Sequence, residues 1–275
     1  MLQSMRISFS TATFYGNTLS YSLRLARDAG FDGVELALGL GYQVWGPRPY
    51  LRAIRAIGMP VLSVHPPFFR LRAFGWPLSV TRRMTSLIRV AHLVDAPICV
   101  SHVPDIRHLD SHRARAFARA IALGYESAPG NITIALETTQ YAGRPMHVLD
   151  DVAALTDYAR EHNCGVTLDT CHTGANGEDL LAVYEAARPL LRNLHLSDTI
   201  GVGPQARTHV MPGEGDLPLR ELLAKMAADG YDGLVTMEMH PREVGYVGRR
   251  GQLQRLRQAL DFVRSAIGAE PALSP

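Results

Sequence analysis

Histidines and carboxylates recur at the ends of short apolar runs along this chain of 275 residues. The stretch GVTLDTCH at 165–172 shows the pattern, because an apolar run leads directly into Asp169 and, three residues later, His172. Each of six successive runs delivers a histidine or an acid in this way. The six residues are His65, His102, Glu137, Asp169, His195 and Glu238.

These side chains suit a divalent metal ion if the fold brings them together. Three imidazoles and three carboxylates without a thiolate are the donor mix that zinc, manganese, cobalt or iron(II) prefers. Clustered carboxylates repel one another, so a cation is the expected occupant. Taken singly, each residue has a structural explanation; Asp169, for example, would cap the following helix. The joint pattern at six run ends favours one metal site.

The apolar runs themselves predict eight β-strands separated by helices. Their spacing of about 30 residues is the spacing expected when about 250 residues divide into eight βα units. We predict strands at 6–10, 33–36, 60–64, 97–101, 133–136, 165–168, 193–196 and 233–237. Amphipathic patterns predict helices at 19–29, 50–57, 78–93, 111–127, 148–161, 178–187, 217–229 and 252–267.

Continuous apolar strands that alternate with helices indicate a parallel sheet covered by helices. Eight such units favour an α/β fold of the (β/α)8 TIM barrel type over an open doubly wound sheet, whose glycine-rich loop is missing from residues 8–17. The carboxyl ends of all strands in such a barrel converge on one face, where enzymes of this fold hold their chemistry. We expect a single barrel domain over residues 1–268 and a C-terminal tail over 269–275.

The composition is that of a globular protein with an ample core, since 47% of residues are hydrophobic and 20% are charged. A formal net charge of +2 provides no global basic field for nucleic acid. No apolar run approaches the roughly 18 residues of a membrane span, and the first residues lack a signal peptide, so we expect a cytoplasmic protein without a membrane partner. Cys99, Cys164 and Cys171 form no CxxC pair and are expected to be reduced.

Seven short motifs carry a resemblance to a known family. They are FDGVEL at 31–36, HPPF at 65–68, LETT at 136–139, LDTCH at 168–172, LHLSD at 194–198, HVMPGEGDL at 209–217 and MEMH at 237–240. LDTCH followed by HLSD and PGEGD is quite specific, whereas HPPF alone is weak. The chain resembles the xylose isomerase-like barrels (AP endonuclease family 2), which include sugar and sugar-phosphate isomerases and epimerases as well as endonuclease IV-type DNA repair nucleases.

The resemblance implies a metal held by four residues that most members share, which are Glu137, Asp169, His195 and Glu238. In the isomerase and epimerase branch, Glu137 and Glu238 also exchange protons with the substrate carbon, and His172 reaches substrate oxygens. The alternative for His172 is a solvent-exposed histidine at the start of a helix.

The first functional hypothesis is therefore a divalent-metal-dependent isomerase or epimerase of a small polyol, keto-sugar or sugar phosphate. One ion would bind adjacent substrate oxygens, while the two glutamates act as base and acid. The substrate-binding candidates are His172, His209, Arg207, Glu35 and Phe68, where Arg207 would suit an anionic or hydroxyl-rich substrate. An ordinary buried ion pair explains Glu35 equally well. The sequence leaves pairing with a second copy of the chain open.

The alternative hypothesis is an endonuclease IV-like phosphodiester hydrolase that acts on abasic DNA or another phosphate ester. The resemblance implies that this branch holds a second metal with His65, His102 and a bridging Glu137, and a third with His172, His209 and an aspartate two residues before that histidine. Arg207 stands at the aspartate position. A guanidinium stays protonated and repels a cation, so Arg207 and the low net charge favour the isomerase, with nucleic acid as a partner only under the alternative.

Overall fold

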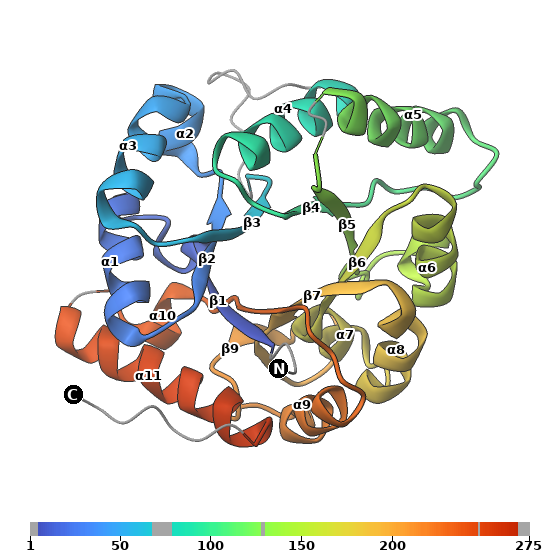
Figure 1. Ribbon diagram of the computed structural model, residues 1–275. Coiled ribbons are helices and arrows are strands. Elements are labelled where there is room, and N and C mark those ends of the chain that lie inside the picture. Colours follow the sequence, from blue (N-terminus) through green and yellow to red (C-terminus); the bar gives the residue numbers. More distant parts are fainter. Residues whose placement is uncertain (1–4, 68–78, 128–129, 247, 269–275) are drawn as a thin grey trace.

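Eight parallel strands close into a barrel with helices around its outside (Figure 1). The computed structural model describes residues 5–67, 79–127, 130–246 and 248–268. The barrel strands are β1 (Arg6–Ser10), β2 (Gly33–Ala37), β3 (Val61–His65), β4 (Ile98–His102), β5 (Thr133–Glu137), β6 (Gly165–Asp169), β7 (Leu191–Leu196) and β10 (Leu234–Met237). They neighbour one another in the order β1-β10-β7-β6-β5-β4-β3-β2, which confirms the predicted single-domain TIM barrel. The predicted tail at 269–275 lies outside the described residues.

The helices follow the strands in the expected alternation. They are α1 (Leu19–Ala29), α2 (Leu40–Trp45), α3 (Pro47–Ile57), α4 (Val80–Leu93), α5 (His112–Ser127), α6 (Val152–Glu161), α7 (Thr170–Asn176), α8 (Leu180–Ala187), α9 (Leu219–Ala228), α10 (Pro241–Val244) and α11 (Arg249–Ala266). Short 3-10 turns lie at Thr11–Phe14, Val148–Asp150 and Arg188–Leu190. The turn at Val148–Asp150 separates the first residues of the helix predicted at 148–161 from α6, because Asp151 caps α6 with its own side chain.

Five strands, β2 to β6, end one residue later than the sequence predicts. In β3 to β6 the added residue is a histidine or an acid, so these polar residues belong to the sheet. The parallel ladder pairs His102 with Glu137 and Asp169 with His195 at the carboxyl end of the barrel. Strand β3 likewise ends on His65, which pairs with Ala37. The strand backbone therefore fixes where these side chains start, which a flexible loop would not do.

The packing explains why these segments adopt their secondary structure. Strands β3 and β6 are buried at every residue, as expected when helices cover the outside of a filled barrel. Helices α1 and α6 begin at side-chain caps, Thr18 and Asp151, and α1 ends at Gly30 in the left-handed conformation. In the part of the chain that is described, no helix combines the length and apolarity needed to cross a membrane.

The three cysteines are buried, and no disulfide joins them. A feature that the sequence did not predict is a two-stranded antiparallel hairpin, β8 (Asp198–Ile200) and β9 (Arg207–Val210), which follows β7. This hairpin matters for the site because it carries His209.

Candidate metal centre

Four buried side chains meet at the carboxyl end of the barrel. Glu137 closes β5, Asp169 closes β6, His195 lies in β7, and Glu238 directly follows β10. One ligand atom from each of the four residues lies within 4.8 Å of the other three. The structure thus brings together the four residues that the sequence resemblance assigns to one metal.

His195 lies at the centre of this group. Its Nδ1 is 2.9 Å from Glu238 Oε2, 3.1 Å from Glu137 Oε1 and 3.9 Å from Asp169 Oδ2. The imidazole is completely buried, and the three carboxylates are almost completely so. The arrangement therefore directs one nitrogen and three carboxylates from four different strand ends toward a common volume.

Three carboxylate oxygens in this volume have no hydrogen bond of suitable geometry, although they are buried. They are Glu137 Oε2, Asp169 Oδ2 and Glu238 Oε2. Histidine nitrogens lie 2.9 Å from two of them, His102 from Glu137 Oε2 and His195 from Glu238 Oε2. A buried carboxylate oxygen without a well-directed donor is costly, and a divalent cation satisfies several such oxygens at once. One imidazole with three carboxylates is a donor set that fits zinc, manganese, cobalt or iron(II).

The electrostatics of the group follow from its burial and its mutual contacts. Burial raises the pKa of Glu238, but the nearby histidines, His195 first, outweigh burial and lower that pKa to about 2. The pKa of Glu137 lies well below its ordinary value because His102 and His195 outweigh the same burial effect. Burial lowers the pKa of His195, yet the surrounding glutamates raise it well above its ordinary value. The histidines thus keep the Glu137 and Glu238 carboxylates ionised in spite of their burial.

His65 and His102 lie beside Oε2 of Glu137, the oxygen that does not contact His195. Their Nε2 atoms are 3.5 Å and 2.9 Å from Glu137 Oε2 and 3.2 Å from each other. Burial lowers the pKa of His65, but the contacts with Glu137 outweigh burial and raise it to about 9. Both histidines, predicted as metal ligands from the sequence, therefore adjoin the four-residue centre through a shared carboxylate, and their role as ligands stays a prediction.

Asp169 uses its two oxygens for two purposes. Oδ1 accepts hydrogen bonds from the backbone N–H of Cys171 at 2.8 Å and of His172 at 3.0 Å, and so caps α7. Oδ2 is the oxygen that faces the metal centre without a hydrogen bond. The two readings of this residue from sequence, a helix cap and a metal ligand, are therefore compatible.

Helix α7 also places His172 at the edge of the centre. Its Nδ1 lies 2.9 Å from the backbone oxygen of Thr138, while the side chain of Thr138 accepts a hydrogen bond from Asp169 N. The His172 side chain is 21% exposed, which is enough to meet a ligand that enters the barrel mouth. Thr138 belongs to the LETT motif but was not predicted to have a role.

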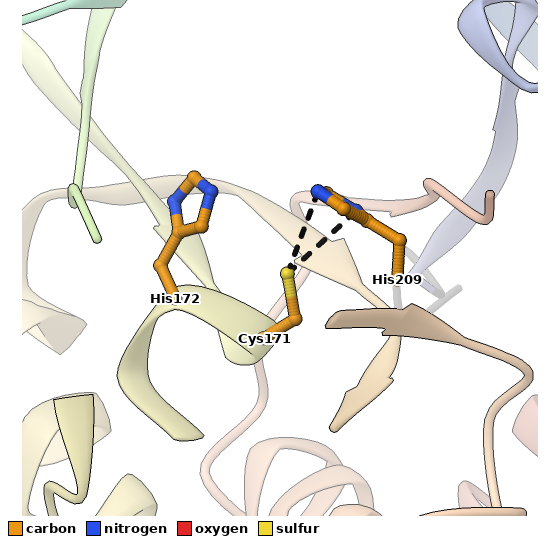
Figure 2. Close-up of side chains that lie close together, drawn as sticks. All are labelled: Cys171, His172 and His209. Carbon is orange, nitrogen blue, oxygen red and sulfur yellow. Dashed lines mark hydrogen bonds between the residues drawn. The ribbon is translucent and has the colours of Figure 1, made fainter. Parts of the chain in front are cut away.

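Cys171, His172 and His209 form a second group that has the geometry to hold a metal (Figure 2). The Cys171 sulfur is 3.6 Å from His209 Nδ1 and 3.7 Å from Nε2. His209 has a φ of 53°, a left-handed conformation that is strained for a residue with a side chain. Burial, followed by the nearby Asp169, raises the pKa of the Cys171 thiol well above its ordinary value. Sequence reasoning did not propose Cys171 as a ligand, because Cys171 belongs to no CxxC pair and the hairpin that carries His209 to it was not predicted.

The remaining predicted site residues have different places. Arg207 Nη2 lies 2.5 Å from Glu243 Oε1, and the Arg207 side chain is 45% exposed, so its guanidinium already has a carboxylate partner. Glu35 is completely buried and contacts His195 Nε2 at 3.1 Å, which favours a role toward this histidine over the predicted contact with substrate. Phe68 lies outside the described residues.

Comparison with known proteins places this geometry in a family. A profile of the xylose isomerase-like TIM barrel family matches residues 23–266. Fructoselysine 3-epimerase of Shigella flexneri is 35% identical over 250 residues, which cover 80% of this chain and 85% of that protein.

Two solved structures share the fold at low identity. The IOLI protein with a bound zinc atom has a TM-score of 0.72 at 18% identity and covers 95% of this chain and 99% of its own. A D-allulose 3-epimerase from Methylomonas sp. in complex with D-allulose has a TM-score of 0.70 at 14% identity. The match covers 96% of this chain and 98% of that one. The profile match and the Shigella relative show that this chain belongs to the xylose isomerase-like TIM barrel family.

Proposed function

We propose that the chain is a divalent-metal-dependent isomerase or epimerase that acts on a sugar or sugar phosphate. The observation that carries this proposal is the convergence of Glu137, Asp169, His195 and Glu238, with three buried carboxylate oxygens that no well-directed hydrogen bond satisfies. The names of the relatives, which include a fructoselysine 3-epimerase and a putative hydroxypyruvate isomerase from Streptomyces coelicolor, support the reaction class.

Glu137 and Glu238 are the proposed base and acid. A divalent cation held by the four residues would withdraw electron density from substrate oxygens. It would thereby lower the pKa of the C–H group beside the carbonyl. Glu137 and Glu238 come from different strand ends, β5 and β10, and both have carboxylate oxygens in the common volume. One glutamate would remove a proton from the carbon beside the carbonyl, and the other would return a proton, with inversion if it approaches the opposite face.

The histidines at the edge of the centre suit a hydroxyl-rich substrate. His172 Nδ1 faces the Thr138 carbonyl at 2.9 Å, and His209 Nδ1 faces the Glu238 carbonyl at 3.1 Å. With Nδ1 directed at a backbone carbonyl, each ring has its Nε2 left to hydrogen-bond a substrate hydroxyl group. Zinc is the first metal to test because it is bound in the related IOLI structure, with manganese, cobalt and iron(II) beside it.

The test begins with the metal content of the purified protein, for which we expect one equivalent per chain. The metal-loaded protein is then incubated in deuterated water with a panel of ketoses, fructosamines and sugar phosphates. Deuterium incorporation beside the carbonyl, detected by NMR, would support the proposal. A protein that binds no metal, or that exchanges no carbon-bound proton in any of these substrates, would contradict it.

Glu238→Gln is the matched variant for this experiment. The amide has nearly the same shape but cannot accept a proton from carbon, so we expect the fold to persist while deuterium exchange falls by at least about 100-fold. Circular dichroism checks the fold. Because Glu238 is also a proposed metal ligand, exchange is measured at a metal concentration at which metal analysis shows the variant to be loaded. Exchange at the wild-type rate would remove Glu238 from the mechanism.

The contacts of His65 and His102 with Glu137 support a second candidate function, a phosphodiester hydrolase with more than one zinc ion. Both Nε2 atoms lie near Glu137 Oε2, as a pair of additional ligands would. Under this alternative the purified protein holds two or three zinc ions and cleaves an oligonucleotide with an abasic site. One metal equivalent with no cleavage would exclude it.

A further inference from the structure

Glu35 lies in the barrel interior, in contact with the ring nitrogen of His195 that does not face the metal centre. Its side chain is completely buried. Three donors approach the same oxygen, Oε2: Ser63 Oγ at 2.8 Å, His195 Nε2 at 3.1 Å and Asn193 Nδ2 at 3.5 Å. Glu35 therefore contacts the centre through His195 and through supporting polar residues.

The contact with Glu35 determines which nitrogen of His195 is available to a metal. A neutral imidazole carries one N–H and one lone pair. If Nε2 donates its hydrogen to Glu35, the lone pair lies on Nδ1, which faces Glu238 Oε2 at 2.9 Å and Glu137 Oε1 at 3.1 Å. This is the nitrogen that points into the proposed metal volume.

A polar layer in the barrel supports this arrangement. The interior of such barrels is usually filled by branched apolar side chains. Here Ser8 Oγ and Thr236 Oγ1 are 2.6 Å apart, and Thr236 Oγ1 donates to Asn193 Oδ1 at 2.8 Å. These bonds orient the amide of Asn193 so that its NH2 group faces Glu35. A buried polar layer of this kind stabilises the fold less than apolar packing would, so a role at the neighbouring centre accounts for it better.

We propose that Glu35 is a positioning residue that holds His195 in the Nε2–H tautomer and thereby makes Nδ1 the metal ligand. The acceptor also increases the basicity of the imidazole, and loss of such a partner typically weakens metal binding by about 10–100-fold. The inference rests on the metal centre of the proposed function, but it concerns metal affinity and makes no claim about the substrate.

Two variants and one control test the proposal through metal affinity. Glu35→Met removes the acceptor with little change in volume, and we expect the zinc dissociation constant, measured by competition with a chromophoric chelator, to rise by about 10–100-fold. Glu35→Gln keeps an oxygen that can accept from Nε2–H, and we expect an intermediate rise. Ser63→Ala removes a donor to Glu35 but leaves the contact with His195, so its dissociation constant should stay close to that of the wild type.

The outcomes separate this inference from the proposed function. Failure of the wild type to bind zinc or cobalt would overturn the metal centre itself. Wild-type affinity in Glu35→Met, with normal binding in the wild type, would overturn only the role of Glu35. The visible spectrum of the cobalt-loaded protein should also differ between the wild type and Glu35→Met, because the ligand geometry changes.

A measurement on the wild type covers the case in which Glu35→Met does not fold. Long-range proton–nitrogen NMR of the zinc-loaded protein reports which imidazole nitrogen carries hydrogen, and a His195→Asn variant assigns the signal. We expect hydrogen on Nε2 of His195. Hydrogen on Nδ1 would overturn the proposal.

Discussion

At the scale of single residues, Asp169 is the most informative position because its two oxygens have separate partners. Oδ1 caps α7 through the N–H groups of Cys171 and His172, and Oδ2 faces the centre. For most site residues a substitution removes the structural contacts and the proposed metal contact together, so the two roles cannot be measured separately. Asp169 therefore allows the metal and the fold to be tested separately.

A pair of substitutions makes this division measurable. In Asp169→Asn the remaining oxygen still caps α7, but an NH2 group replaces Oδ2, so we expect metal binding to be lost with little change in the stability of the metal-free protein. Asp169→Ala also removes the cap, which costs about 1 kcal/mol more. Metal analysis and denaturant unfolding of the metal-free variants provide the two readouts. Equal stabilities of the two variants would show that the cap contributes nothing.

At the scale of structural elements, the loop after β7 is organised by Asp198. This buried carboxylate accepts backbone hydrogen bonds from Thr199 at 2.9 Å, Gly213 at 2.9 Å and Leu217 at 3.0 Å. A Cβ at Gly215 would lie 2.4 Å from Asp198 Oδ1 and 2.6 Å from the Thr199 backbone oxygen. The HLSD and PGEGD motifs thus contain a carboxylate and the glycine that lets the loop close on it.

Substitutions in this loop should loosen the segment that carries His209. Asp198→Ala leaves several N–H groups without acceptors, and we expect it to lower the free energy of unfolding by about 2 kcal/mol or more. Gly215→Ala introduces the clash with the same carboxylate and should lower it by about 1–3 kcal/mol. Denaturant unfolding and limited proteolysis between residues 198 and 217 check both expectations. Gly251→Ala is the control, because the position of its Cβ is open and Gly251 does not have a positive φ. Gly201→Ala would not serve, because Gly201 has a positive φ.

The loop after β5 contains the clearest source of pH dependence outside the centre. Arg144 donates to Asp150 Oδ2 at 2.7 Å and to Oδ1 at 2.8 Å, and Thr139 Oγ1 and His147 N also donate to this carboxylate. Burial raises the pKa of Asp150, but these donors outweigh burial and lower it below its ordinary value. A lowered folded-state pKa contributes stability above the unfolded-state pKa of about 4, and this contribution is lost as the pH falls through the folded-state pKa.

Asp150→Asn tests this contribution. We expect the variant to lose about 1–2 kcal/mol of unfolding free energy at pH 7, because the charge-assisted hydrogen bonds to Asp150 are weakened while Arg144, which is 32% exposed, remains partly solvated. Its stability should then change less than that of the wild type as the pH falls below about 4. Urea unfolding at several pH values measures both effects. Parallel stability curves for the two proteins would contradict the assignment.

At the scale of the whole molecule, the proposed metal connects strands β5, β6, β7 and the end of β10. An ion that binds only the folded state stabilises it by mass action, by about 2.7 kcal/mol when its free concentration is 100 times the dissociation constant. We therefore expect removal of the metal with a chelator to lower the melting temperature, and addition of zinc to restore it. Glu137→Gln, which replaces one charged ligand by a neutral amide, should respond less to both treatments. An unchanged melting temperature in the wild type would argue against a tightly bound ion.

Many elements of the barrel could be predicted from the sequence because long amphipathic helices and apolar strands leave a clear periodic pattern. All eight predicted strands overlap the barrel strands, and helix 19–29 agrees with α1 at both ends. Helices α2, α7 and α10 and the β8–β9 hairpin were missed. These elements have only three to seven residues, fewer than two helical turns or a full strand pattern, so local periodicity does not reveal them.

The amino-acid sequence by itself placed six histidines and carboxylates directly after or within predicted strands, and the barrel geometry predicted that they converge. The resemblance to a known family then singled out Glu137, Asp169, His195 and Glu238 as one ligand set. Only the tertiary structure decided how each side chain is used: which oxygen of Asp169 is left for a metal, that Arg207 pairs with Glu243, and that Glu35 contacts His195. The physical reason is that strand order and direction follow from short-range patterns, whereas the orientation of a buried side chain depends on distant partners, such as His195 for Glu35, 160 positions away.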